Sequence, residues 1–169
     1  NNLRLIGATT AGNGGAIDIK AGTVNLENVD ISGGHAELGG AIYLASGSAF
    51  LTASGTTFSY NTASFGGAIY NNGGQVTFSG GGNSFSNNQA GNGGAIYTVG
   101  GTIDMGGTSF SGNSATGNGG AIYNNGSSLS VADGGVFTGN HATENGGAIY
   151  NDGNGSLTIQ GGELSGNHA

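Results

Sequence analysis

Acidic and basic side chains are the first candidates for chemistry, and this chain has few of them. Its 169 residues include 9 Asp or Glu but only 2 Lys or Arg, namely Arg4 and Lys20, and the formal net charge is -7. A glycosidase needs a paired set of carboxyl groups, and a polysaccharide lyase needs basic groups. The acids are scattered, and two cations cannot form a nucleic-acid-binding surface. We therefore predict that the chain has no catalytic residue, is not an enzyme and binds no nucleic acid.

The three histidines, His35, His141 and His168, are the remaining candidates for metal chemistry, because the chain has no cysteine. His141 and His168 lie 27 residues apart. A zinc site needs a third and a fourth ligand, and the residues at the same spacing, Ser114 and Gln89, are not typical ones. We expect these histidines to be exposed turn residues, with no metal site and no cofactor.

The composition indicates which elements carry these side chains. The chain has 40 glycines and no proline, and 7% of its residues are charged. Glycine at this level disfavours helices, the absence of proline excludes collagen, and the low charge is unlike disorder. A string Gly-Gly-Ala-Ile recurs at intervals of 25, 27, 27, 26 and 27 residues, beginning at Gly14, Gly39, Gly66, Gly93, Gly119 and Gly146.

Two further patterns keep a fixed place in each repeat. A Phe-x-x-Asn string occupies residues 58–61, 85–88, 110–113 and 137–140, and Leu164–Asn167 is a variant of it. Between these strings lie short stretches such as Val76–Phe78 and Leu129–Val131, in which apolar and polar residues alternate. Short alternating stretches bounded by glycine predict β-strands that are buried on one side.

A single repeat cannot bury its own apolar face, so the repeats must stack. We predict an all-β fold, a right-handed parallel β-helix (solenoid) of about six coils with ~27 residues each and three short parallel sheets. Residues 1–169 are expected to form a single domain, either a segment of a longer solenoid or a filament subunit. No run of 18 apolar residues occurs, so no part of the chain is expected to span a membrane.

Stacking places equivalent residues in columns. If the isoleucine of each Gly-Gly-Ala-Ile string points inward, strand alternation puts the alanine before it and the tyrosine after it outward. The tyrosines would form an exposed stripe that either stabilises the stack or binds a protein or a glycan: Tyr43, Tyr70, Tyr97, Tyr123 and Tyr150. A second column is predicted to be a ladder of amides at tight corners: Asn61, Asn88, Asn113, Asn140 and Asn167. A third is predicted to stack in the core: Phe58, Phe85, Phe110 and Phe137.

The paired strings Gly-Gly-Ala-Ile and Phe-x-x-Asn resemble the repeats of the chlamydial polymorphic membrane protein family, from about residue 14 to residue 169. The resemblance implies an autotransporter passenger, a right-handed β-helix displayed at the bacterial cell surface or outside the cell, usually with an adhesive role. Two features of this sequence differ from what the resemblance implies: we expect no translocating β-barrel domain within residues 1–169, and these residues lack the cysteines that many passengers carry.

Two functions follow from these observations. The first is a non-catalytic adhesin or passenger module that attaches to a surface protein or glycan of a host or neighbouring cell. The second is an extracellular filament subunit that forms a homopolymer by end-to-end stacking, because neither end of the predicted solenoid has a convincing cap.

Overall fold

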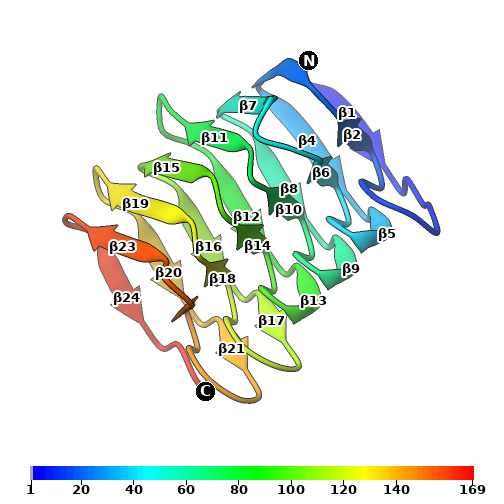
Figure 1. The fold of residues 1–169 in the computed structure, drawn as a ribbon. Coiled ribbons are helices and arrows are strands. Elements are labelled where there is room, and N and C mark those ends of the chain that lie inside the picture. The colour runs from blue at the N-terminus through cyan, green and yellow to red at the C-terminus, as the bar shows by residue number, and fades with distance from the viewer. Residues whose placement is uncertain (1) are drawn as a thin grey trace.

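The computed structural model describes residues 2–169, which form short strands joined by turns and stacked as a parallel β-solenoid (Figure 1). Each complete coil contributes one strand to each of four parallel sheets, and the chain climbs to the next coil after one circuit. Paired residues in adjacent coils lie one repeat apart, as Phe110 and Phe137 do. The predicted all-β parallel solenoid of about six coils is confirmed.

We name the sheets after their most regular inward or outward residues. The Phe sheet consists of β1 (Leu3–Ile6), β4 (Val29–Ser32), β8 (Thr57–Ser59), β12 (Ser84–Ser86), β16 (Ser109–Ser111), β20 (Val136–Thr138) and β24 (Glu163–Ser165). The Ala sheet, which follows it along the chain, consists of β5 (His35–Leu38), β9 (Thr62–Phe65), β13 (Gln89–Asn92), β17 (Ser114–Ala115) and β21 (His141–Ala142).

The other two sheets complete the coil. The Tyr sheet consists of β2 (Ile17–Ile19), β6 (Ile42–Leu44), β10 (Ile69–Asn72), β14 (Ile96–Val99), β18 (Ile122–Asn125) and β22 (Ile149–Asp152). The aliphatic sheet consists of β3 (Gly22–Glu27), β7 (Ala49–Ser54), β11 (Gln75–Phe78), β15 (Thr102–Gly106), β19 (Ser128–Ala132) and β23 (Ser156–Ile159).

The Ala sheet corrects the predicted number of three sheets. Its strands are two to four residues long, and in most of them a single alanine is the residue buried inside the coil, as Ala90 and Ala115 are. One small inward side chain leaves no apolar alternation in the sequence. The strand forms because its backbone groups pair with the same segment of the adjacent coils.

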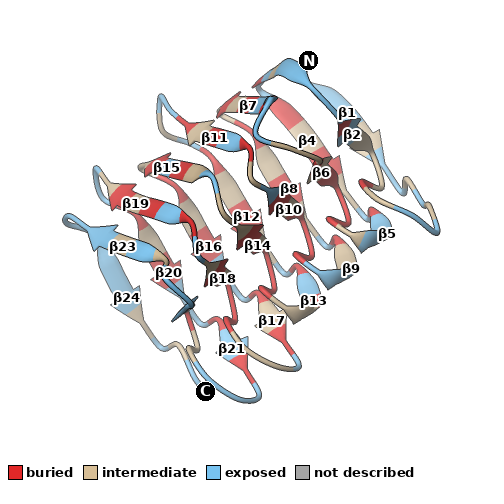
Figure 2. Ribbon diagram, in the orientation of Figure 1, coloured by how far each residue is buried: buried red, intermediate tan, exposed pale blue. Residues whose placement is uncertain are grey.

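The core is a narrow column of side chains enclosed by the four sheets. Ile42, Ile69, Ile96 and Ile122 of the Tyr sheet are fully buried, as predicted for the inward position. The aliphatic sheet, which follows the Tyr sheet along the chain, contributes two inward residues per strand, such as Ile103 and Met105 on β15. Figure 2 shows this burial in the middle coils and greater exposure in the first and last coils.

The alanine before each of these isoleucines is also buried, which corrects the expectation that it points outward. Ala41, Ala68, Ala95 and Ala121 have no exposed surface. The N–H groups of Ala41 and Ile42 both donate to the carbonyl of Ala68, each at 2.9 Å. Two consecutive donors on one acceptor break the extended geometry, so strand alternation begins only at the isoleucine.

The corner between the Phe sheet and the Ala sheet also differs from expectation. The ladder asparagines do not occupy the left-handed conformation; the residue before each of them does, as Tyr60 (φ 56°), Asn87 (φ 55°) and Gly112 (φ 62°) show. At Gly94, in a Gly-Gly-Ala-Ile string, glycine is required by steric contact and not by backbone conformation, because a Cβ would lie 2.2 Å from the carbonyl oxygen of Gly120. The adjacent coil passes too close for any side chain at this position.

Both ends of the described stack leave inward-facing side chains open. Leu3, in register with the buried Val29, is 62% exposed at one end, and Leu164, in register with the buried Phe137, is 50% exposed at the other. Among residues 2–169, no helix is long and apolar enough to cross a membrane.

Candidate binding face

The five predicted tyrosines lie side by side on the outer surface of the Tyr sheet, and we call them the Tyr stripe: Tyr43, Tyr70, Tyr97, Tyr123 and Tyr150. All five are partly exposed. Successive ring centroids are 5.6, 5.2, 4.7 and 5.0 Å apart. The first three pairs are stacked, with ring planes 27°, 13° and 19° apart.

This stacking decides what the stripe presents to a ligand. The middle rings have a neighbouring ring on each face, and Phe65 packs edge-on against Tyr97 with centroids 5.2 Å apart. A sugar ring therefore finds no free aromatic face on Tyr70 or Tyr97. The surface offers ring edges and phenol hydroxyls in a row, together with Phe65, which is 37% exposed.

One phenol of the stripe has a charged partner. The Tyr123 hydroxyl donates to Asp152 Oδ2 at 2.8 Å, and Gly153 N donates to Asp152 Oδ1 at 2.6 Å. Burial and this hydrogen bond raise the pKa of Tyr123 above its ordinary value. The same hydrogen bond, followed by the one from Gly153, lowers the pKa of Asp152. Burial, followed by the flanking Tyr97 and Tyr43, raises the pKa of Tyr70. The raised pKa values keep the hydroxyls of Tyr70 and Tyr123 as neutral hydrogen-bonding groups.

The phenylalanine column has no free surface and lies inside the coil. Phe58, Phe85, Phe110 and Phe137 are at most 1% exposed. Their centroids are 4.6, 4.8 and 4.6 Å apart, with ring planes within 6° of parallel. Phe78 of the aliphatic sheet packs edge-on against Phe58 and Phe85. This column holds adjacent coils together and is not available to a partner.

The asparagine column is a buried hydrogen-bonded ladder, and Asn113 illustrates one step. Its Nδ2 donates to the Phe85 carbonyl at 3.0 Å and to Asn140 Oδ1 at 2.9 Å. Its Oδ1 accepts from the backbone N and from Nδ2 of Asn88, at 3.1 and 2.9 Å. The same bonds link Asn61 to Asn88 and Asn140 to Asn167. The amides are structural groups with no free donor directed at a ligand.

Two further polar columns escaped sequence reasoning. Asn118 Oδ1 accepts from the backbone N and from Nδ2 of Asn145 on the surface, at 3.1 and 2.8 Å. Inside the coil, Asn71 and Asn124 each close the turn to the aliphatic sheet by accepting from the backbone N–H three residues later. Both had a signal: asparagine precedes several Gly-Gly-Ala-Ile strings, and alternation from the inward isoleucine puts Asn71 inward.

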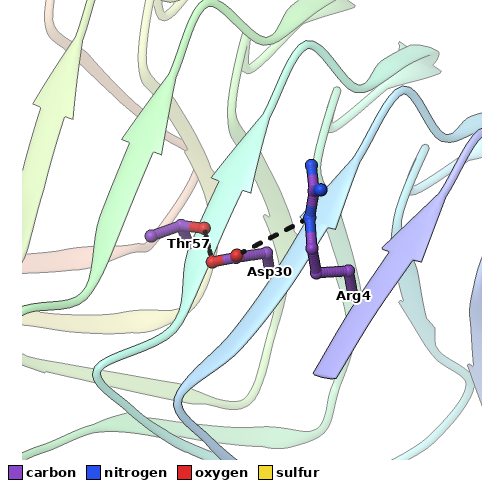
Figure 3. Close-up of polar contacts among 3 residues, drawn as sticks. All are labelled: Arg4, Asp30 and Thr57. Atoms are coloured by element: carbon purple, nitrogen blue, oxygen red, sulfur yellow. Dashed lines mark hydrogen bonds and ion pairs between the residues drawn. The ribbon is translucent and has the colours of Figure 1, made fainter. Parts of the chain in front are cut away.

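Among the carboxylates, one has a structural role and two line the same hollow. On the outer face of the Phe sheet, Asp30 accepts a hydrogen bond from the Thr57 hydroxyl at 2.6 Å and lies 4.0 Å from Arg4 Nε (Figure 3). Asp104 and Asp133 line a hollow of about 510 Å³ between the aliphatic sheet and the Phe sheet. The described residues that line it include no histidine, lysine or arginine.

The histidines lie on the outer side of the Ala sheet, not in turns. His35 is on β5 and its Nδ1 is 2.8 Å from the Thr62 hydroxyl. His141, on β21, pairs in register with His168 of the last coil. Within residues 2–169, no three histidine, aspartate or glutamate side chains gather in a group that could hold a metal ion.

The repeat geometry can be compared with known families. A family model of the Chlamydia polymorphic membrane protein repeat matches residues 55–72, 84–99, 107–125 and 134–152. Each matched segment contains one Phe-x-x-Asn string and the Gly-Gly-Ala-Ile string that follows it. The four segments lie in the central coils. No curated protein and no solved structure matches the chain. The four matches, at the spacing of the coils, show that the chain contains repeats of the Chlamydia polymorphic membrane protein type.

Proposed function

We propose that this chain is a rigid, non-catalytic module of a bacterial surface protein, and that the Tyr stripe attaches it to a protein on a host or neighbouring cell. The polymorphic membrane protein repeats and the β-solenoid fold support a passenger-like module at the outer surface. A stack of coils suits this role, because it holds equivalent side chains at regular intervals and so allows many weak contacts at once.

The observation that carries the proposal is the uniformity of the stripe compared with other outward columns. On the Ala sheet, the outward column reads Thr62, Gln89, Ser114 and His141. On the aliphatic sheet, it reads Thr77, Asp104, Ser130 and Thr158. Outward positions on these two sheets therefore tolerate different side chains in adjacent coils, whereas the Phe sheet repeats a small hydroxyl side chain at one outward position, as in Ser59, Ser86 and Ser111. Five successive tyrosines at one outward position therefore indicate a specific role for this side chain, which is either ring stacking or recognition of a partner.

The exposed chemistry of the stripe favours a protein over a glycan as the partner. Aromatic recognition of sugars uses ring faces, and here the faces of the middle tyrosines are covered by one another. Ring edges with hydroxyls, beside the exposed Phe65, match the mixture of apolar contact and hydrogen bonding that protein interfaces use.

The test separates recognition from stacking. The triple variant Tyr70→Phe, Tyr97→Phe, Tyr123→Phe keeps the rings and removes three hydroxyls. Binding of the labelled chain to cultured mammalian cells and to bacteria, measured by flow cytometry, should fall at least about tenfold if the hydroxyls contact the partner. Thr77→Val with Ser130→Ala, on the outward face of the aliphatic sheet, is the matched control and should bind normally.

Two results would remove the proposal. If the parent chain binds no cell, it does not act as an attachment module. If the Tyr→Phe variant binds as the parent does and the corresponding Tyr→Ala variant is merely less stable, the stripe serves the stack alone. Binding of the parent to a glycan array would replace the protein partner by a sugar.

A filament subunit is the second candidate, and the open ends favour it. Leu3 and Ile6 at one end and Leu164 at the other are exposed residues of the same Phe sheet. A second copy with β1 docked on β24 would continue this sheet. However, β24 begins a further coil that has no strand in the Tyr sheet or the aliphatic sheet, whose last strands are β22 and β23. Each of these two sheets would therefore lack one strand at the junction. Electron microscopy of the purified chain distinguishes filaments from short dispersed rods.

A further inference from the structure

His141 and His168 form a pair of imidazoles in adjacent coils, and we propose that they bind one divalent transition-metal ion, such as Cu²⁺ or Zn²⁺. The two residues are direct partners in a parallel bridge, and both are exposed. Paired residues on neighbouring parallel strands lie about 4.8 Å apart and point to the same side of the sheet. The two side chains therefore leave the surface side by side.

The backbone around the pair is held in place. The N–H groups of His141 and His168 donate to the carbonyls of Asn113 and Asn140, each at 2.9 Å, and Ala142 N donates to the carbonyl of His168, also at 2.9 Å. Inward of the histidines, Ala142 is fully buried and Asn140 belongs to the buried ladder. The imidazoles are free to choose rotamers, whereas the Cα positions from which they start are fixed.

The chemistry of the pair matches these ions. Imidazole nitrogen suits zinc, copper and nickel, whereas calcium and magnesium prefer oxygen. Two nitrogens bound to one ion at about 2.0–2.1 Å lie roughly 3 Å apart, so the side chains need only lean toward each other. Water fills the remaining positions of such a two-ligand site.

The electrostatic surroundings favour a cation. The formal net charge of the chain is -7, and its two basic residues, Arg4 and Lys20, precede the second coil. The histidine pair lies at the opposite end of the rod. No lysine or arginine in the last coils repels the ion.

His35 provides a built-in single-imidazole control. It occupies the same column of the Ala sheet, but its partners in the adjacent coils are Thr9 and Thr62. Its Nδ1 is 2.8 Å from the Thr62 hydroxyl. A metal ion at His35 would gain one imidazole, whereas at the pair it gains two.

The experiment is calorimetric titration of the tag-free chain with Cu²⁺ and, separately, with Zn²⁺ in a buffer that does not bind metal. One ion per chain should bind. His141→Ala and His168→Ala should each weaken binding at least about tenfold, because the second imidazole acts at high effective concentration. His35→Ala should leave the affinity unchanged. Electron paramagnetic resonance of the Cu²⁺ complex should report two nitrogen ligands in the parent and one in either pair variant.

A gain-of-function variant makes the proposal independent of any loss of stability. Thr62→His places a second imidazole beside His35 in the same register, and the stoichiometry should rise to two ions per chain. The proposal is overturned if the parent binds no ion, if His35→Ala weakens binding as much as the pair variants do, or if Thr62→His adds no site.

Discussion

Replacing Asn113 by alanine tests whether the buried amide ladder holds adjacent coils together. Asn113 is completely buried in the middle of the stack. Its amide makes two donor and two acceptor contacts, which connect it to Asn88, Phe85 and Asn140. Alanine removes all four contacts without changing the backbone conformation that the position requires.

The size of the effect follows from what each partner retains. Asn88 Nδ2 keeps its bond to the Phe58 carbonyl, and Asn140 Oδ1 keeps its bond from the backbone N of Asn113. The backbone N–H of Asn88 loses its side-chain acceptor in a fully buried site. An unsatisfied buried donor costs about 1–3 kcal/mol, and each further lost bond costs about 0.5–1.5 kcal/mol. With three further bonds lost, the free energy of unfolding should fall by roughly 2.5–7.5 kcal/mol.

The matched control is Asn118→Ala in the surface ladder. Asn118 Oδ1 also accepts from a backbone N and an Nδ2, both of Asn145, but Asn145 is exposed. Water can replace the lost acceptor there, so the cost should stay below about 1 kcal/mol. The two variants remove similar bonds and differ in burial.

Urea denaturation followed by far-ultraviolet circular dichroism measures both variants. For a domain of this size, a loss of roughly 2.5–7.5 kcal/mol corresponds to a decrease in melting temperature of roughly 5–30 °C. Hydrogen exchange should locate the loss at the amide of Asn88 and in the coils on either side. If Asn113→Ala is no more destabilising than Asn118→Ala, the buried ladder does not hold the coils together and the reasoning is refuted.

Three further variants test the buried phenylalanine stack, the Gly-Gly corner and the hydrogen bond between Tyr123 and Asp152. Phe110→Ala removes a ring stacked on Phe85 and Phe137, with centroids 4.8 and 4.6 Å apart, and should lower the free energy of unfolding by about 3–5 kcal/mol. In urea denaturation, a smaller loss of free energy than for Tyr97→Ala would contradict a buried stack. Gly94→Ala puts a Cβ 2.2 Å from the Gly120 carbonyl oxygen and should abolish soluble folded protein. The control Gly126→Ala, where no atom lies within 4 Å of the added Cβ, should cost about 1 kcal/mol through its positive φ. Equal yields and melting temperatures of the two variants would refute the close approach. Tyr123→Phe removes the hydrogen bond that lowers the pKa of Asp152, so this pKa should rise toward its ordinary value in a carboxyl NMR titration. A carboxyl group with a lowered pKa stabilises the fold above its unfolded-state pKa, and this stabilisation is lost as the pH falls through the folded-state pKa. Tyr123→Phe should therefore reduce stability at neutral pH and leave it unchanged in strong acid. An unmoved Asp152 titration would exclude the bond.

The sequence was sufficient for the columns whose residues are large or recur without exception. The Phe-x-x-Asn strings predicted both the stacked rings and the positions of the amides, because only a stack brings residues 25–27 apart into contact. The inward isoleucines followed from the same period. In these cases the side chain itself supplies the coil-to-coil contact.

The features that were missed depend on the backbone. The Ala sheet has one buried alanine in most strands, so its pairing is visible only as backbone hydrogen bonds such as Gln89 N to the Asn61 carbonyl. The inward alanines result from a shared carbonyl acceptor at the Gly-Gly corner, which no alternation pattern contains. Likewise, the left-handed residue at the next corner is Tyr60 in one coil and Gly112 in another, and residue preference alone does not identify it.

The direction of the ladder explains why the outer surface can vary while the stack persists. The Oδ1 of each ladder asparagine accepts from the asparagine of the preceding coil, and its Nδ2 donates to the Oδ1 of the asparagine in the following coil. Every coil therefore offers the same acceptors to the coil before it and the same donors to the coil after it. Any repeat with this asparagine, a core phenylalanine and the Gly-Gly-Ala-Ile corner can therefore follow any other. Because the coil-to-coil contacts lie inside, the outward positions of the Ala sheet and the aliphatic sheet are free to differ. A surface module built in this way can change its exposed residues, or its number of coils, without redesign of its core.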